Sequence, residues 1–80
     1  MRFIYHPKVR SDDIPSLAAD IRTRIQDAIE QRLGTEPLKY GLPLRSGLRQ
    51  YRKLRVGDYR VIYAVAGEDI RIIVIGHHTN

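Results

Sequence analysis

The sequence predicts a small α+β domain in which one or two helices pack on one face of an antiparallel sheet. Three observations predict this fold class. An apolar-rich run ends at His6-Pro7, a stretch with helical periodicity covers residues 16–34, and three strand-like runs separated by short glycine turns fill residues 48–75. Successive strands joined by turns this short must be antiparallel. The 80 residues suffice for a single domain over residues 1–80, whose second sheet face stays uncovered.

The N-terminal half is expected to hold one strand and two helical segments. Arg2–Tyr5 is predicted to be an edge strand, because the proline after His6 disfavours a helix there. One or two helical turns over residues 8–13 are interrupted by Pro15, which has no N–H to donate. Ser16 is expected to cap the next helix, which ends near Gly34. The apolar side chains of that helix recur at steps of three and four residues: Leu17, Ile21, Ile25, Ala28, Ile29 and Leu33.

The C-terminal half is expected to be a loop followed by three strands. Prolines and glycines break any periodicity in residues 35–47, which predicts a connecting loop over one sheet edge. Strands are then expected over residues 48–56, 59–66 and 70–75, joined by turns at Gly57-Asp58 and at residues 67–69. The strand, helix, strand, strand, strand order completes the predicted layer pair.

The chain is strongly basic. Fourteen Lys and Arg against nine Asp and Glu give a net charge of +5, which favours a polyanionic partner such as RNA, DNA or an acidic protein. The longest apolar run, residues 72–75, is far shorter than the roughly 20 residues of a membrane span, so no membrane partner is expected. The N-terminus shows no secretory signal pattern and the chain has no cysteine, so we expect a cytoplasmic location.

A basic stripe marks the second predicted strand. Arg49, Tyr51, Lys53 and Arg55 occupy alternate positions and therefore share one strand face. Such a face suits a phosphate-rich partner, and Arg49, Tyr51 and Arg52 are candidate RNA-binding residues. By contrast, the charged positions of the helix are expected to form a solvated mixed-charge face: Asp20, Arg22, Arg24, Asp27, Glu30 and Arg32.

Most familiar enzyme sites are absent from the sequence. The chain has no metal-ligand spacing, no phosphate-binding glycine loop and no serine elbow. The remaining Arg, Lys, Tyr and His side chains suit cleavage of RNA through its own 2′-hydroxyl. That reaction needs a proton removed, a pentacoordinate phosphate stabilised by fixed cations, and a leaving oxygen protonated. The alternative is that the stripe only binds phosphates.

A longer pattern resembles a known family. Residues 51–78 read YRKLRVGDYRVIYAVAGEDIRIIVIGHH, with a basic strand, a glycine turn, a Tyr-Arg-aliphatic-aliphatic-Tyr strand and a closing apolar strand ending in Gly-His. This pattern resembles the RelE/ParE toxin superfamily of toxin–antitoxin modules. The resemblance implies a RelE-like fold and a ribosome-dependent mRNA endonuclease, or mRNA interferase, that inhibits translation without a metal or other cofactor. It also implies a cognate acidic antitoxin that neutralises the toxin, with higher-order toxin–antitoxin complexes.

The resemblance also implies the site residues. Lys53 matches a strand residue that acts as base or charge stabiliser, and Arg55 matches the arginine before the turn. Arg60 matches the arginine that grips the scissile phosphate. His77 and His78 lie where the family often has a basic pair, and one of them would supply acid–base chemistry.

Several alternatives stay open at this point. RelE-like members usually continue to a tyrosine that has no counterpart here, so His78 or Tyr51 would take over its role, or the chain would bind its antitoxin without cleaving RNA. The ParE branch keeps the same scaffold but acts on DNA gyrase. Arg60 could also be structural, paired with Glu68 or Asp58.

Overall fold

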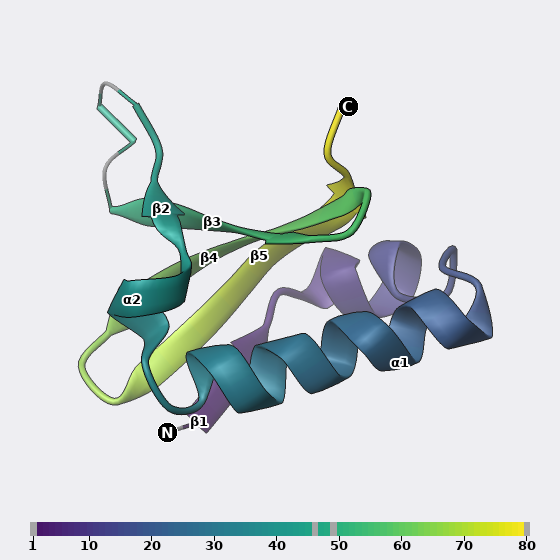
Figure 1. Ribbon diagram of the computed structural model, residues 1–80, viewed down its shortest axis with the longest axis horizontal. Coiled ribbons are helices and arrows are strands. Elements are labelled where there is room, and N and C mark those ends of the chain that lie inside the picture. Colours follow the sequence, from purple (N-terminus) through teal and green to yellow (C-terminus); the bar gives the residue numbers. More distant parts are fainter. Residues whose placement is uncertain (1, 46, 49, 80) are drawn as a thin grey trace.

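The computed structural model describes residues 2–45, 47–48 and 50–79. A helical layer lies against one face of a sheet, and the other face is turned away from it (Figure 1). The elements follow in this order: β1 (Arg2–Tyr5), η1 (Val9–Asp13), α1 (Ala19–Ala28), η2 (Ile29–Leu33), α2 (Pro37–Tyr40), β2 (Leu42–Pro43), β3 (Tyr51–Val56), β4 (Tyr59–Ala66) and β5 (Asp69–His77). The α+β class with helices on one sheet face is confirmed.

The sheet has the strand order β1-β5-β4-β3-β2. β3, β4 and β5 pair antiparallel, as their short turns require. β1 pairs parallel to β5, so the expectation of a wholly antiparallel sheet was wrong on this strand. The reason is that tight turns dictate direction only for the strands they join. β1 is separated from its neighbour by the whole helical layer, a connection long enough to permit parallel pairing.

The main helix begins later than predicted and ends where predicted. Its N-cap is Ala18, and the hydroxyl of Ser16 instead donates to the carbonyl oxygen of Asp13 at 2.8 Å, so the predicted Ser16 cap was wrong. Ser16 thus stabilises the turn after η1. α1 continues directly into the π-helical η2, and the helix terminates at Gly34.

The predicted loop over residues 35–47 contains two short elements. α2 starts with Pro37 in its first turn, where a missing N–H is tolerated. β2 adds to the edge of β3, opposite Arg52 and Lys53, and its Pro43 suits an edge strand. β3 starts at Tyr51 rather than at residue 48, β4 matches its predicted bounds, and β5 extends beyond residues 70–75 at both ends.

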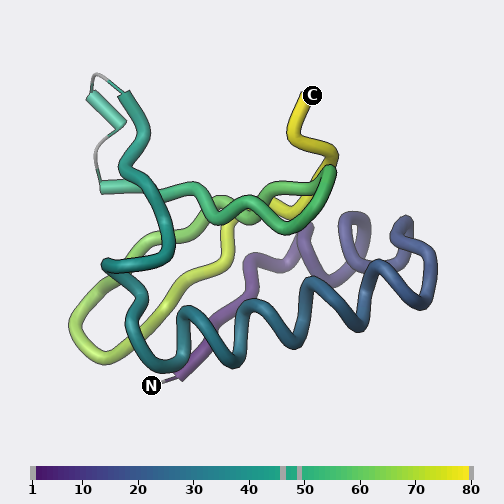
Figure 2. The backbone as a smooth tube through the Cα atoms, viewed as in Figure 1, coloured from purple at the N-terminus to yellow at the C-terminus, as the bar shows by residue number. Residues whose placement is uncertain are grey.

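The core lies between the helical layer and the sheet face that it covers (Figure 2). Leu54 and Val56 of β3 point into it, so the alternate residues Lys53 and Arg55 point away. The largest buried side chain is that of Tyr63, and its hydroxyl donates to the carbonyl oxygen of Pro37 at 2.5 Å. The fully or almost fully buried core residues include Val9, Ile25, Ile29, Leu33, Val61, Tyr63, Ile70 and Ile72.

We searched residues 2–45, 47–48 and 50–79 for a helix that could span a membrane. In this part of the chain, no helix has both the length and the apolar character needed to cross a bilayer.

Candidate functional site

Three basic residues of β3 and β4, Lys53, Arg55 and Arg60, lie on the sheet surface opposite the helical layer, which we call the open face. The register between strands arranges the central part of this face in three rows. The rows are Arg55–Arg60–Gly76, Lys53–Ile62–Val74 and Tyr51–Ala64–Arg71. The described residues that directly follow β2, 44–45, and those that follow β5, 78–79, project from the sheet on this side, away from α1 (Figure 1). They flank the open face at its two ends.

Positive charge is concentrated on the open face without acidic side chains between the cations. None of the nine positions in the three rows is Asp or Glu. Arg55 and Arg60 stand directly opposite each other on neighbouring strands, and like charges in such a pair destabilise a sheet. Lys53 is exposed one row further along. An anion bound between these side chains would relieve their repulsion, so the arrangement fits a phosphate-binding surface.

Backbone carbonyl groups orient both arginines at the end of the sheet near the β3–β4 turn. Arg55 donates from Nε to the carbonyl oxygen of Gly57 at 2.5 Å. Arg60 donates from Nε to the carbonyl oxygen of His77 at 3.4 Å. Each guanidinium has five N–H donors, and a bond through Nε holds the group while its planar fork still suits bidentate contact with a phosphate.

The two histidines lie at the same end of the sheet with their rings stacked, centroids 5.3 Å apart, but their Nδ1 atoms have different partners, Thr79 for His77 and Asp58 for His78. His77 pairs in register with Tyr59, which packs against the core, and the two rings meet edge to face with centroids 5.5 Å apart. His78 donates from Nδ1 to the carbonyl oxygen of Asp58 at 3.0 Å, because a carbonyl can only accept. In the neutral ring this leaves Nε2 of His78 as a proton acceptor. Of the predicted pair, His78 is therefore better prepared to act as a base.

Tyr51 lies on the open face but far from the paired arginines. It stands in the third row, four residues along β3 from Arg55, which corresponds to about 13 Å. It is half-buried, so its ring offers a surface on which a base could stack. This distance favours a contact with a neighbouring nucleotide over the acid role at the Arg55–Arg60 row.

Arg52 occupies the other strand face and holds the α2–β2 segment. Its Nη2 donates to the carbonyl oxygens of Leu38 and Gly41, at 2.7 and 2.5 Å. The structure thus separates Arg52 from the cations of the open face. Arg49, the remaining predicted RNA-binding residue, lies outside the described residues.

Two open-face residues escaped sequence reasoning. Arg71 is exposed in the third row, and it is the one charged residue in the apolar run from Ile70 to Ile75. A single charge within an apolar strand is the sequence feature that could have identified Arg71 as an open-face residue. Ile62 is 7% exposed yet lies outside the main core, beneath the long side chains of the open face. Its neighbours Arg60 and Lys53 place cations around a small apolar centre.

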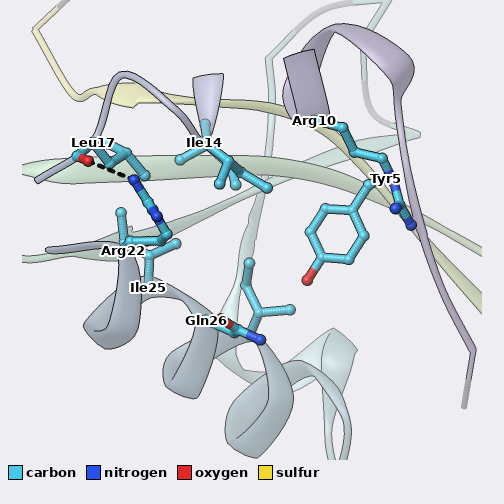
Figure 3. A pocket seen from close by; sticks show the side chains of 9 residues that line it. Tyr5, Arg10, Ile14, Leu17, Arg22, Ile25 and Gln26 are labelled. Carbon is cyan, nitrogen blue, oxygen red and sulfur yellow. Dashed lines mark hydrogen bonds between the residues drawn. The ribbon is translucent and has the colours of Figure 1, made fainter. Parts of the chain in front are cut away.

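A cavity of about 200 Å³ lies on the opposite side of the sheet, between η1 and α1 (Figure 3). Apolar side chains such as Ile14 and Ile25 line it, and Arg22, Arg10 and Tyr5 stand around it. Burial raises the pKa of the Tyr5 hydroxyl, nearby Glu30 raises it further, and Arg10 opposes this. The cavity is separated from the open face by the sheet, so it takes no part in the candidate site.

Metal binding has no obvious location in the part of the chain that the structure describes. No group of three or more His, Asp or Glu side chains is placed there to hold an ion. The carboxylate of Asp13 accepts a hydrogen bond from the backbone N–H of Ile75 at 3.0 Å, beside the β5 bulge. The carboxylate of Asp69 is bound by Arg2, which lowers its pKa, with a smaller contribution from Arg71.

Several solved structures of similar fold are toxins of toxin–antitoxin modules. The RelBE2 toxin–antitoxin complex from Mycobacterium tuberculosis matches with a TM-score of 0.86 and 26% identity, over 99% of this chain and 92% of that one. The RelB–RelE complex from Methanococcus jannaschii matches with a TM-score of 0.71 and 26% identity, over 95% and 91% of the two chains. A YoeB/ParE toxin from Agrobacterium tumefaciens has a TM-score of 0.78 at 20% identity, over 98% and 99%.

A family model gives the assignment directly. No curated protein matches the sequence significantly. The model described as ParE toxin of type II toxin-antitoxin system, parDE, matches residues 4–80. With nearly the whole chain matched, this protein belongs to the ParE toxin family of type II toxin–antitoxin systems, within the RelE/ParE toxin superfamily.

Proposed function

We propose that this toxin is a ribosome-dependent endoribonuclease that cleaves mRNA by attack of the 2′-hydroxyl. The observation that carries the proposal is the convergence of Lys53, Arg55 and Arg60 on the open face, in rows of the sheet whose nine positions include no Asp or Glu. A like-charged cross-strand pair is unfavourable in the free protein and becomes favourable when a phosphate lies across it. The site of action would be the cytoplasm, where programmed ribosomes are found.

The proposed roles follow from the positions of the side chains. Arg55 and Arg60 hold the scissile phosphate and stabilise the charge of the pentacoordinate state, and Lys53 adds to that stabilisation from the next row. Nε2 of His78 takes part in proton transfer, because its Nδ1 is engaged with Asp58. The 2′-oxygen then forms a bond to phosphorus while the bond to the 5′-oxygen breaks, so a 2′,3′-cyclic phosphate is the expected product.

The test is cleavage of mRNA on programmed ribosomes. Purified toxin should cut ribosome-bound mRNA, and Lys53→Met should slow single-turnover cleavage by about 10²-fold, the scale of losing one electrostatic stabiliser. Lys8→Met is the matched control, since Lys8 is also exposed but precedes η1 on the helical side. Equal rates for wild type and Lys53→Met would remove the lysine from the mechanism.

A second candidate is inhibition of DNA gyrase by binding, without bond cleavage. The family model favours it, because the model that matches residues 4–80 is that of ParE toxins. A supercoiling assay with purified gyrase discriminates between the candidates. Inhibition of supercoiling together with intact ribosome-bound mRNA would replace the nuclease proposal. A chain that does neither and causes no growth arrest would be a toxin that only binds its antitoxin.

We further propose that a cognate acidic antitoxin neutralises this chain, with higher-order complexes of the two proteins. Two relatives in the comparison were solved as complexes of RelE with RelB or as RelBE2. The net charge of +5 supports an acidic partner, since opposite charges accelerate association and favour correct pairing.

A further inference from the structure

The cavity between η1 and α1 has an apolar floor and a polar rim (Figure 3). Its volume is about 200 Å³. Ile25 and Ile29 are each 1% exposed, so the floor consists of side chains that also pack in the core. The apolar lining residues come from both sides of the helical layer and from the sheet: Ile14, Leu17, Ile25, Ile29 and Ile75. A cavity lined in this way receives a small apolar group more readily than water.

Two side chains of α1 place polar groups at the edge of the cavity. Arg22 and Gln26 are four residues apart, so they are neighbours on one face of the helix. Nη2 of Arg22 donates to the carbonyl oxygen of Leu17 at 3.2 Å, which orients the guanidinium and uses one of its five N–H groups (Figure 3). The amide of Gln26 supplies further donors beside it. The pair can therefore donate hydrogen bonds to one carboxylate.

The charges around the cavity favour one end of it for an anion. None of the described residues that line the cavity is Asp or Glu, whereas Arg10 and Arg22 both line it. The guanidinium of Arg10 lies over the ring of Tyr5, 5.6 Å from its centre. Glu30 stands close enough to raise the pKa of the Tyr5 hydroxyl, so negative charge is already present at that end. The Arg22 end is therefore the better place for a carboxylate.

We propose that this cavity binds a small monocarboxylate with a compact apolar body, of the size of phenylacetate. Arg22 and Gln26 would donate to the carboxylate, and the apolar body would lie against Ile14 and Ile29. The volume sets the size of the ligand. An apolar cavity of about 150 Å³ holds benzene, so a cavity of about 200 Å³ has room for a ring and a short acid.

A free acid fits this cavity better than a peptide or a nucleic acid does. Pockets for larger molecules usually have volumes of about 300–1,000 Å³, so the backbone of a peptide would have to stay outside while one side chain entered. A phosphate group fits the rim but brings no apolar group for the isoleucine floor, whose burial supplies the other part of the binding energy.

Binding at this cavity would stabilise the folded chain without contact with the open face. The lining joins three elements, since Ile14 follows η1, Ile29 begins η2 and Ile75 lies on β5. Asp13 already connects η1 to β5, because its carboxylate accepts from the N–H of Ile75 at 3.0 Å. A ligand that binds only the folded state raises the ratio of folded to unfolded chains about elevenfold at ten times its Kd. This stabilisation does not depend on what the open face binds or cleaves.

The test is an NMR titration of the full wild-type chain with sodium phenylacetate. We expect a Kd of roughly 1 mM or tighter for a ligand of this size. The ring protons should give NOEs to the methyl groups of Ile14, Ile29 and Ile75, and none to Ile62 beneath the open face. Phenylacetamide and acetate should each bind at least about tenfold more weakly, because the first lacks the charge and the second lacks the apolar body.

A pair of arginine variants tests the polar end of the site. Arg22→Gln should weaken phenylacetate binding about tenfold or more, because the charged donor to the carboxylate is lost. Arg24→Gln is the matched control. It removes the same charge from the same helix, but Arg24 does not line this cavity, so binding should stay within about twofold of wild type.

Four results would overturn the proposed site. Phenylacetamide could bind as tightly as phenylacetate, Arg24→Gln could lose as much affinity as Arg22→Gln, or the NOEs could connect the ligand to Ile62 in place of Ile14 and Ile29. The fourth is tighter binding of a blocked Glu-Phe dipeptide, which carries the same groups on a backbone and should bind at least about tenfold more weakly than the free acid. The comparison of the small ligands uses wild type alone, so it decides even if a variant fails to fold.

Discussion

The contact between Tyr63 and the α2–β2 segment gives the sharpest prediction about stability. Tyr63 is fully buried, and its hydroxyl is the donor to the carbonyl oxygen of Pro37. In Tyr63→Phe that oxygen loses its partner inside the protein, which should lower the free energy of unfolding by about 1–3 kcal/mol. For a domain of this size, that corresponds to a fall of at least roughly 4–8 °C in Tm.

Gly41 is the second half of the same contact. A Cβ there would overlap the hydroxyl oxygen of Tyr63 and stand 2.7 and 2.8 Å from Cζ and Cε1 of the ring, where carbon atoms need about 3.5–4.0 Å. Gly41→Ala should therefore cost about 1–3 kcal/mol through overpacking. In the Tyr63→Phe background the overlap with the hydroxyl is gone but the ring contacts remain. The double variant should therefore be destabilised by less than the sum of the two single-variant destabilisations, by roughly 0.5 kcal/mol or more.

Urea unfolding of the wild type, both single variants and the double variant measures these free energies. The reasoning would be refuted if Gly41→Ala were as stable as wild type, or if the two costs simply added. Either result would mean that the segment before β2 does not lie against the Tyr63 ring.

Two further predictions concern charged residues. Arg52→Met should destabilise the chain by about 1–3 kcal/mol, because the carbonyl oxygens of Leu38 and Gly41 lose a charged donor. The RNA affinity of the folded variant should equal that of wild type. Loss of RNA binding without loss of stability would contradict the structural role of Arg52. Asp69 should titrate below its ordinary pKa of 3.8, because Arg2 binds the ionised form. Its contribution to stability is therefore present at higher pH and lost as the pH falls through the lowered pKa. Carboxyl NMR should show an upward shift of this midpoint in Arg2→Gln, and an unchanged midpoint would exclude the ion pair in solution.

Strands joined by tight turns were the most predictable part of this fold. The positive φ of Gly57, at +60°, and Gly67, at +61°, is a conformation that glycine adopts without strain, so both turns were recognisable from composition. The direction of β1 and the elements α2 and β2 were not predictable in this way. α2 and β2 depend on tertiary contacts with Tyr63 and Arg52, which no local pattern reveals.

The candidate site was predictable to the extent that strand alternation determines it. Lys53 and Arg55 share a face because they are two residues apart, and the register of a two-residue turn then brings Arg60 opposite Arg55. Alternation could not place residues after the β5 bulge, which shifts the pairing beyond Tyr63 and changes which side chains share a face. The face of His77, which follows the bulge, was therefore outside its reach, whereas Arg71 lies between the β4–β5 turn and the bulge and pairs with Ala64 as the turn requires.

The cross-strand pair of Arg55 and Arg60 is unfavourable for stability, so its presence calls for a functional explanation. Sheets usually place opposite charges or apolar pairs across strands, and a pair of arginines lowers stability by roughly 0.2–1 kcal/mol. Functional sites often retain such unfavourable arrangements because the ligand resolves them. The nuclease proposal explains this pair by a phosphate shared between the two guanidinium groups.

The most direct test of that shared phosphate is a double-mutant cycle of Arg55→Ala and Arg60→Ala, read out as single-turnover cleavage of mRNA on programmed ribosomes, with folding of each variant checked by circular dichroism. Residues that act on one group as a unit are strongly non-additive in such cycles. We predict that each single variant slows cleavage by about 10²-fold or more and that the double variant is little slower than the worse single variant. Independent, multiplying effects, or cleavage at the wild-type rate by either single variant, would contradict a common phosphate site on the open face.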